Sequence, residues 1–395
     1  MKKHRLNLTG LAQADLAGLN RIGIAALFAL IALMTACAQV KPELVPTSAP
    51  TATPLPTQTP TSTPRPTITP SPAPTSTPTP SLRQLTTGGC CVQPGWSLDS
   101  SQVLFIDKPS ANAPVGLYAV DIVTGALKPP QCVAPVALYS RDRSLITYLD
   151  KQKTVVEKVS TGEKWVIPNN GQSVAFSPDG QKLAWADEDD NDYIPFDQRR
   201  SDLYIANLDG AQATRIARVY GGGFVGWLPS STKILLSGRP SLDVRERTLS
   251  VFDLTTKTFT KLVSAERVSG VSISNEGTWI AYYITFDADQ SRNSIWLQRT
   301  DGSPPRKLEL WGAYQWRDDG HLLVIPTRDS RDKAFEVLEV DAATGKIRKL
   351  TDAAMTPLQI LNGDWRVSPD GRYMVYVSSV DRNLWLLTLP AISGQ

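Results

Sequence analysis

The stretch VAFSPDGQKLAW, Val174–Trp185, decides the fold. A short apolar strand is followed by a Pro-Asp-Gly turn and by a second strand that alternates apolar and polar residues. Proline presets φ in such a turn, and glycine accepts the positive φ that the turn requires. This is the clearest unit of an internal repeat, and self-similarity of this kind is the sequence signature of repeat folds.

Seven copies of the unit recur through the chain. The best match is VSPDGRYMVY at 367–376, and looser copies begin at Trp96, Tyr139, Trp227, Ile273 and Trp316. The residues equivalent to Ser177 stand at positions 97, 140, 177, 228, 274, 317 and 368. Most copies continue into a third strand, a second turn and a fourth strand. Four short strands per unit, repeated, predict an all-β, seven-bladed β-propeller over residues 81–395.

The two ends of this region complete each other. The seventh unit ends at Leu389 without a fourth strand, and the region opens with Leu82–Thr86, LRQLT, which matches RKLT at 348–351. We expect the N-terminal segment to supply the missing strand of the last blade. That pairing would close the ring and remove two exposed sheet edges.

The repeated residues are interpreted as structural. Asp179, Asp370 and their equivalents are expected to brace the turns by accepting local backbone N–H groups. Aromatic residues that recur at one phase of the repeat are expected to pack one blade on the next: Trp96, Phe176, Trp185, Trp227, Trp316 and Tyr376. Gly221-Gly222-Gly223 lacks the Lys-Ser/Thr of a phosphate-binding loop and predicts a turn between blades.

These units resemble the WD40-like, PD40 repeats of the TolB propeller family. The resemblance covers residues 81–395 and is strongest at Ser177–Gly180 and Ser368–Gly371. The namesake of the family resembles a six-bladed ring behind a separate N-terminal domain. The resemblance therefore implies the fold and does not imply the namesake's role.

The N-terminus has the pattern of a secretory signal. Lys2, Lys3, Arg5 and Arg21 precede an apolar run from Ile22 to Leu33, and small residues lead to Cys37. The run is too short for a membrane-spanning helix, which needs about 20 apolar residues. The Cys resembles that of a bacterial lipobox, so residues 1–36 are predicted to be a lipoprotein signal peptide and Cys37 the lipidated residue. The chain would then be anchored extracytoplasmically to a membrane of the cell envelope.

A linker is predicted over residues 37–80. Residues 41–80 hold 13 Pro, 12 Thr and 4 Ser. So little apolar surface recurs that no core can form, and such Pro-rich stretches are extended, semi-rigid spacers. We interpret this segment as a disordered stalk that joins the lipidated Cys37 to the propeller.

The charge distribution removes one class of partner. The chain carries 41 basic and 38 acidic residues, and four of the basic ones and one of the acidic ones lie in residues 1–36. Beyond the signal peptide the two signs are therefore equal in number. Nucleic acid, which attracts basic surfaces, is not expected as a partner, and no nucleotide site is expected.

The candidate partner site lies on the loops between second and third strands, which are long in the third to sixth units. These loops would gather on one rim of the ring, and exposed aromatic residues there often anchor interfaces. The candidate residues are Asp187, Glu188, Asp189, Asp190, Asp192, Tyr193, Phe196, Arg199, Arg200, Arg245, Asp287, Asp289, Arg328 and Arg331. The predicted function is a non-catalytic binding or scaffold module for a protein or a glycan.

Catalysis is the alternative. The chain has only His4 and His321, which leaves little for a His-dependent triad or a metal held by several histidines. A carboxylate pair could still serve an extracytoplasmic, glycan-directed hydrolase or lyase on the loop-bearing face. No cofactor is expected. The acidic run from Asp187 makes Ca²⁺ a candidate ligand, although the spacing of a calcium-binding loop is missing.

Three cysteines remain for disulfides in an oxidising compartment. They are Cys90, Cys91 and Cys132. A bridge from Cys132 to Cys91 or Cys90 is the preferred pairing, because both segments precede first strands and would lie on one face. A bond between the adjacent Cys90 and Cys91 is the second choice.

Overall fold

The computed structural model describes residues 80–392, apart from 109, 111, 112, 114, 132–137, 190, 192 and 328–333. The chain divides into two units, residues 1–75 and 76–395, and the account below concerns the second. The predicted signal peptide, the lipidated Cys37, the stalk up to residue 79 and Cys132 lie outside the described residues. Among the described residues, no helix is long and apolar enough to span a membrane.

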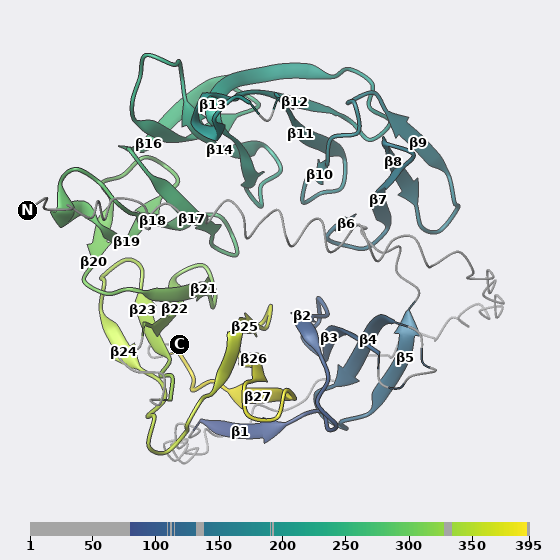
Figure 1. The fold of residues 1–395 in the computed structure, drawn as a ribbon, viewed down its shortest axis with the longest axis vertical. Helices are drawn as coiled ribbons and strands as arrows, with labels where there is room; N and C mark the ends of the chain where they lie inside the picture. The colour runs from purple at the N-terminus through teal and green to yellow at the C-terminus, as the bar shows by residue number, and fades with distance from the viewer. Residues whose placement is uncertain are drawn as a thin grey trace, which may run out of the picture. The chain divides into compact units, whose positions relative to one another are not determined.

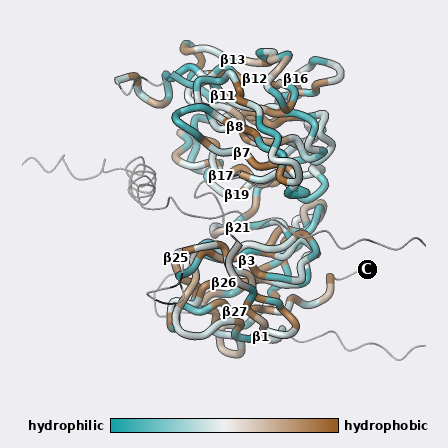
Figure 2. The backbone as a smooth tube through the Cα atoms, turned by 90° about the vertical axis from the view of Figure 1, so that its right-hand side faces the viewer, coloured by the Kyte–Doolittle hydropathy of each residue, from teal (hydrophilic) through white to brown (hydrophobic). Residues whose placement is uncertain are grey.

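The described region is all-β. Two single-turn 3-10 helices, η2 (Phe196–Gln198) and η3 (Gln290–Arg292), interrupt a series of short antiparallel strands. Figure 1 shows these strands as small sheets set around a common centre, which is the arrangement of a β-propeller. In Figure 2, hydrophobic stretches recur along the strands and hydrophilic ones along the connections.

Five sheets have four strands each. One holds β2 (Val92–Trp96), β3 (Gln102–Asp107), β4 (Gly116–Asp121) and β5 (Leu127–Gln131). The next holds β6 (Leu138–Tyr139), β7 (Leu145–Asp150), β8 (Lys153–Lys158) and β9 (Lys164–Ile167). Another holds β17 (Val268–Ile273), β18 (Trp279–Ile284), β19 (Ser294–Arg299) and β20 (Arg306–Leu308). A fourth holds β21 (Gly312–Trp316), β22 (His321–Pro326), β23 (Leu338–Asp341) and β24 (Ile347–Lys349). The fifth holds β25 (Ile360–Val367), β26 (Tyr373–Ser378), β27 (Leu384–Thr388) and β1 (Ser81–Gln84).

The sixth sheet has seven strands. It runs through β10 (Ala175–Phe176), β11 (Lys182–Glu188), β12 (Arg200–Asn207), β13 (Thr214–Trp227), β14 (Lys233–Arg239), β15 (Arg247–Asp253) and β16 (Thr258–Ala265). Strand β13 joins its two halves: residues Thr214–Tyr220 pair with β12, and residues Tyr220–Trp227 pair with β14. The prediction of a turn at Gly221–Gly223 is wrong, because these glycines lie inside β13.

The predicted closure by the N-terminal strand is confirmed. Strand β1 pairs with β27 in antiparallel register, with Ser81 opposite Thr388 and Gln84 opposite Trp385. The chain therefore begins and ends the described region in the same sheet.

Apolar side chains fill the spaces between neighbouring sheets, and the recurring tryptophans take part as predicted. Leu235 and Val251 of the seven-stranded sheet, for example, share a buried cluster with Ile280 and Tyr282 of β18. Three indoles also reach the first strand of the preceding repeat unit, which for Trp227 belongs to the same seven-stranded sheet. Trp227 Nε1 donates to the Ala175 carbonyl, Trp316 Nε1 to that of Ser272 and Trp96 Nε1 to that of Arg366, each over 3.2 Å.

The Ser-x-Asp turns brace themselves as predicted. Ser177 Oγ donates to Asp179 Oδ1 over 2.5 Å and accepts the Lys182 N–H over 2.9 Å. The same serine-to-aspartate hydrogen bond forms in the turns at Ser97, Ser140 and Ser368. Hydrogen bonds from Ser97 and from the Ser101 backbone and hydroxyl lower the pKa of Asp99 to about 2.

Two turns depart from the Ser-x-Asp pattern, and an aspartate of one braces the other. The turn at Ser274 has Glu276 in the position of the bracing aspartate, and the turn of the next sheet has Arg317 in the position of the serine. Asp319 of that next turn accepts from Ser274 Oγ and from the Glu276 and Thr278 N–H groups instead. Asp319 thus braces its neighbour's turn and ties the two sheets together.

Arg317 is thereby released for a buried ion pair. Its side chain is 3% exposed and meets Glu339 of β23, which is 5% exposed. Arg317 also donates to the Gly371 carbonyl over 2.8 Å and to that of Pro390. It therefore joins the β21–β24 sheet to the turn and the C-terminal segment of the sheet that closes the ring.

Candidate functional site

Long connections gather at one edge of the sheets. Because antiparallel strands reverse direction at each turn, the connections β11–β12, β14–β15 and β18–β19 leave their sheets at the same edge. We call the described residues of 188–200, which leave out 190 and 192, together with residues 239–247, 264–267 and 285–293, the loop rim. The last strand of each sheet leads to the next sheet at this same edge, so residues 264–267, the end of β16 and its connection to β17, belong to it.

The first two segments of the loop rim contact each other. Arg239 Nη2 donates to the Asp197 carbonyl and lies 3.6 Å from Asp197 Oδ2. The Arg247 guanidinium lies over the Phe196 ring, 5.3 Å from its centroid. Such cation–π contacts hold an aromatic ring in place while one of its faces stays accessible.

Glycine in β13 permits this approach. A Cβ on Gly221 would lie 2.6 Å from Asp197 Cα, and one on Gly222 would lie 2.2 Å from the Ser237 carbonyl oxygen. Gly221 also has a φ of +61°, which L side chains rarely adopt. These glycines therefore let η2 and β14 pack against the middle of β13.

The remaining segments are tied in by three further arginines. Arg245 Nε lies 2.9 Å from Glu266 Oε1, and Arg292 Nη2 donates to the Ser264 carbonyl over 2.8 Å. The Arg267 guanidinium lies 5.2 Å from the centroid of Phe286. Contacts between opposite charges and between cations and rings thus run continuously from the β11–β12 loop to the β18–β19 loop.

Buried carboxylates support the loop rim from beneath. Asp202 of β12 receives two hydrogen bonds from Arg218, 2.7 and 2.8 Å long. Those bonds, together with the charges of Arg218, Arg215 and Arg200, lower the pKa of Asp202. Asp287 is buried and forms a 3.1 Å ion pair with Arg292.

Glu188 differs from these carboxylates. Partial desolvation raises its pKa, against the opposing charge of Arg199, although the residue as a whole is exposed. The neighbouring Ser201 is buried, and its Oγ has no hydrogen-bond partner. A Cβ on Gly223 would lie 3.2 Å from that Oγ and 3.4 Å from Glu188 Oε1, so the two side chains converge on one bare stretch of β13.

The structure brings together several predicted site residues. Asp189 pairs with Arg200 at 3.1 Å, and Phe196, Arg245 and Asp287 make the contacts above. Tyr193 is 96% exposed. Other residues have local roles: Asp187 faces Asp202 in the strand register, Arg199 Nε donates to the Ile194 carbonyl, and Asp289 caps η3.

Four predicted site residues fall outside the described residues. They are Asp190, Asp192, Arg328 and Arg331. The calcium expectation, which draws on the same acidic run, therefore stays a prediction.

The sequence analysis missed Glu266, Arg267 and Phe286. Its candidates came from the long loops, whereas Glu266 and Arg267 form the short connection from β16 to β17. The repeat pattern could have indicated them, because the connections between sheets lie at the same edge as the long loops.

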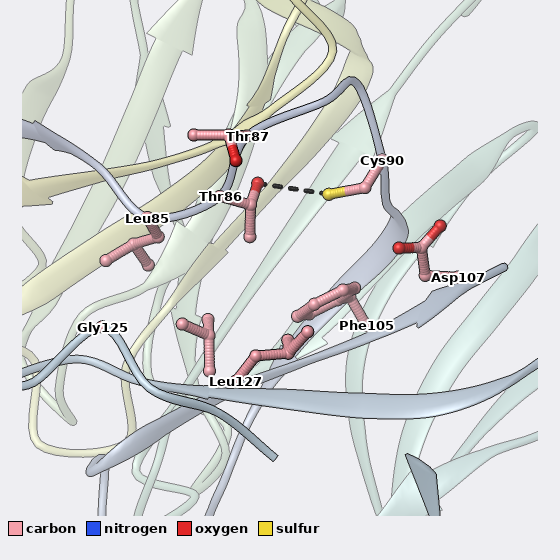
Figure 3. A pocket seen from close by; sticks show the side chains of 9 residues that line it. Leu85, Thr86, Thr87, Cys90, Phe105, Asp107, Gly125 and Leu127 are labelled. Atoms are coloured by element: carbon pink, nitrogen blue, oxygen red, sulfur yellow. Dashed lines mark hydrogen bonds between the residues drawn. The ribbon is translucent and has the colours of Figure 1, made fainter. Parts of the chain in front are cut away.

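A pocket of about 340 Å³ lies apart from the loop rim, on the first sheet. Leu85, Thr86 and Cys90 of the β1–β2 connection line it together with Phe105, Asp107 and Leu127 (Figure 3). The disulfide joins Cys90 to Cys91. The preferred prediction, a bridge to Cys132, is therefore wrong, and the second choice, the bond between the adjacent cysteines, is the one that forms.

Comparison with known proteins finds similarity only in the fold. No family model matches the chain, and no curated protein matches its sequence. Among solved structures, an oligogalacturonate lyase in complex with manganese is 16% identical, with a TM-score of 0.53 over 78% of this chain and 93% of that one. The oligogalacturonate lyase of Vibrio parahaemolyticus is 12% identical, with a TM-score of 0.54 over the same shares.

TolB structures are also among the matches. The putative TolB of Agrobacterium tumefaciens is 13% identical, with a TM-score of 0.38 over 75% of this chain and 97% of that one. TolB, the namesake of the expected family, is thus among the structures that this chain is similar to. At these identities the likeness concerns the fold alone.

Proposed function

We propose that this chain is a lipid-anchored β-propeller of the cell envelope that binds a protein or glycan partner through its loop rim, without catalysis. The observation that carries the proposal is the loop rim itself. Arginines, carboxylates and exposed aromatic rings from three loops form one connected surface, and aromatic and arginine side chains are enriched where proteins bind partners.

The propeller is proposed to have seven blades. The seven-stranded sheet divides at Tyr220, where β13 passes from β12 to β14. Counted this way, β10 to the first half of β13 form one four-stranded blade, and the second half of β13 to β16 form another. The five remaining sheets supply the other blades.

Exposure supports a binding role for the aromatic residues. Tyr193, Phe196 and Phe286 are all exposed, and aromatic side chains are enriched where proteins bind partners. Arginines lie over two of these rings, so those rings are positioned before any partner arrives. Preorganised side chains lose less entropy on binding.

The test is photo-crosslinking in intact cells from position 193. A photoreactive residue in place of Tyr193 should give a discrete conjugate with a protein or a glycan. The matched control is Val123, which is 82% exposed in the β4–β5 turn, at the opposite edge of the sheets. Equal conjugates from both positions, or none from position 193, would contradict the proposal.

The anchor is tested separately. A palmitate analogue should label the chain, and Cys37→Ser should abolish the label. Labelling that survives this substitution would contradict lipidation at Cys37, while leaving the binding site untouched.

One observation favours catalysis as the second candidate. The Glu188 carboxylate and the unpartnered Ser201 Oγ converge on Gly223, and partial desolvation raises the pKa of this exposed residue, the direction that general acids in carboxylate-based enzymes show. Turnover of a glycan or peptide panel that Glu188→Gln abolishes, with Glu266→Gln unaffected, would support a hydrolase or lyase. Absence of turnover by the folded full chain would leave binding as the function.

A further inference from the structure

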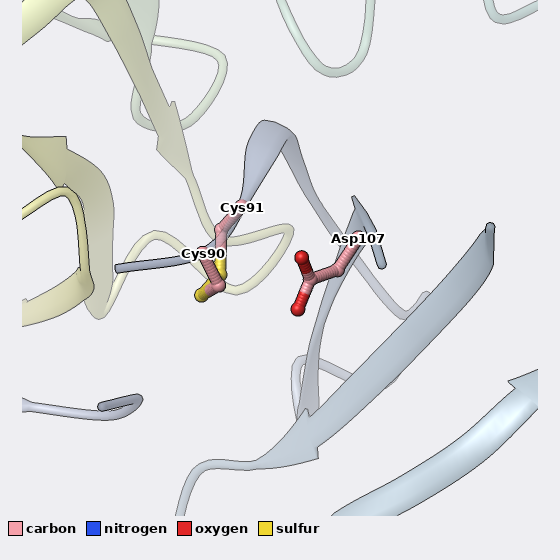
Figure 4. Close-up of side chains that lie close together, drawn as sticks. All are labelled: Cys90, Cys91 and Asp107. Carbon is pink, nitrogen blue, oxygen red and sulfur yellow. A yellow bond between two sulfur atoms is a disulfide. The ribbon is translucent and has the colours of Figure 1, made fainter. Parts of the chain in front are cut away.

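The adjacent cysteines meet a carboxylate that comes from another strand. Cys90 and Cys91 lie in the connection from β1 to β2, and Asp107 ends β3. The sulfur atoms and a carboxylate oxygen lie within 4.8 Å of one another. In Figure 4 the Asp107 carboxylate is turned toward the cysteine pair. Within the described part of the chain, this is the one group of three cysteine, histidine or acidic residues so placed.

The fold holds the pair in place independently of the disulfide. Gly88 and Gly89 turn the chain with φ of +92° and +70°. The Gly89 N–H donates to Asn383 Oδ1 over 3.1 Å, and Thr86 Oγ1 accepts the Leu384 N–H over 2.9 Å. The connection is therefore attached to the start of β27 on both sides of its turn, so opening the disulfide leaves these attachments intact.

The surroundings suit a small ion. Cys91 is 6% exposed and packs in a cluster with Phe105 and Val377. Cys90 is less buried and lines the 340 Å³ pocket, where Thr86 Oγ1 lies 3.1 Å from its sulfur. The buried side of the pair is thus apolar, while its open side has room for an ion with bound water.

We propose that the reduced Cys90–Cys91 pair and Asp107 together bind one thiophilic divalent cation of the Zn²⁺ or Cd²⁺ class. Thiolate sulfur selects such cations. Two thiolates and one carboxylate fill three positions of a tetrahedral zinc-type site, and water fills the fourth.

The disulfide and the metal exclude each other, because both use the same two sulfur atoms. Two molecules of a small thiol, R–SH, reduce the disulfide to two cysteine thiols and are oxidised to R–S–S–R. The cation then replaces the two thiol protons, which leave to solvent, and two metal–sulfur bonds form. After loss of the cation the two thiols take up protons again, and exchange with R–S–S–R, which is reduced to two R–SH, restores the disulfide, so binding depends on the redox state.

The test is a Cd²⁺ titration of the full chain carrying Cys37→Ser and Cys132→Ser, so that only Cys90 and Cys91 supply sulfur. The protein is reduced with a phosphine, which is then removed. Thiolate-to-cadmium charge-transfer absorption should rise to one equivalent per chain and should be absent from the oxidised protein. Either Cys90→Ser or Cys91→Ser should abolish that absorption.

The carboxylate is tested against a matched aspartate. Asp107→Asn should weaken Cd²⁺ binding by at least about tenfold, a scale that supporting groups of metal sites commonly reach. Asp150→Asn, an exposed residue at the end of β7, should leave binding unchanged.

Three outcomes would overturn the proposal. The first is no absorption in the reduced protein, and the second is equal absorption in the oxidised protein. The third is equal affinity in Asp107→Asn, which would mean chelation by thiols alone. Circular dichroism follows the fold throughout, and a reduced protein that unfolds would also count against the site, because Asp107 would no longer meet the pair.

Discussion

The two edges of the sheets hold their carboxylates in different ways. At the edge of the Ser-x-Asp turns, Asp99, Asp142, Asp179 and Asp370 accept hydrogen bonds from residues two positions away. At the loop rim, Asp197, Glu266 and Asp287 pair with arginines, two of them across separate segments. The carboxylates of these four turns are therefore held locally and serve the fold, with Asp319 as the exception that reaches a neighbouring turn. The carboxylates of the loop rim depend on contacts between segments, and this edge leaves charges and rings exposed.

The largest expected effect lies at the edge of the turns. Arg317→Ala leaves Glu339 buried beside Arg348 alone and should lower the free energy of unfolding by about 3–5 kcal/mol, as breaking buried pairs does. Urea unfolding followed by tryptophan fluorescence measures the loss. Arg372→Ala, at an exposed arginine of a neighbouring turn, is the control and should change little. A loss equal to the control's would mean that the Arg317 pair does not join the sheets.

A smaller loss of stability is expected at the turn of Ser274, which is braced by Asp319 of the neighbouring turn. Asp319→Ala removes the acceptor of Ser274 Oγ and of two backbone N–H groups. It should destabilise the chain by on the order of 2 kcal/mol, the scale for hydrogen bonds to a charged group. The same unfolding curve serves as the measurement, with the exposed Asp150→Ala as control. Equal midpoints for the two variants would contradict the exchange between turns.

Opposite pH dependences should separate the two edges. The pKa of Asp99 is lowered from 3.8 to about 2, so its contribution to stability is present above the unfolded value and is lost as pH falls toward 2. Partial desolvation raises the pKa of the exposed Glu188, so its contribution is favourable in acid and is lost as pH rises through the folded value.

Urea midpoints across the acid range check this prediction. Asp99→Asn should flatten the loss of stability toward low pH. Glu188→Gln should raise the midpoint at neutral pH relative to the parent chain. A lower neutral midpoint for Glu188→Gln would show that its charge stabilises the fold, contrary to the desolvation argument.

The smallest effect on stability is expected at the loop rim. The Arg245 side chain is 82% exposed in its pair with Glu266, so Arg245→Ala should change the free energy of unfolding by less than about 0.5 kcal/mol. The crosslinking yield from position 193 should nevertheless fall in this variant. A large loss of stability with an unchanged yield would reverse the roles assigned to the two edges.

The sequence predicted what is encoded locally. The hairpins and the serine–aspartate bonds follow from a few adjacent residues, and the closure by β1 follows from the match between LRQLT and RKLT. It could not predict that β13 runs unbroken through Gly221–Gly223, because that depends on the approach of Asp197 and Ser237. The partners of Arg245 and Arg267 could not be predicted either. The sequence offers many arginines and carboxylates at similar spacing, and only three-dimensional packing determines which of them meet.

The pairing of β1 with β27 has a mechanical consequence. Ser81 at the start of β1 lies opposite Thr388 at the end of β27, and β1 is an edge strand that follows directly from the preceding chain. Tension transmitted along that chain is therefore applied first to the β1–β27 hydrogen bonds. Those bonds would be peeled one pair at a time from Ser81 before the other sheets bear load.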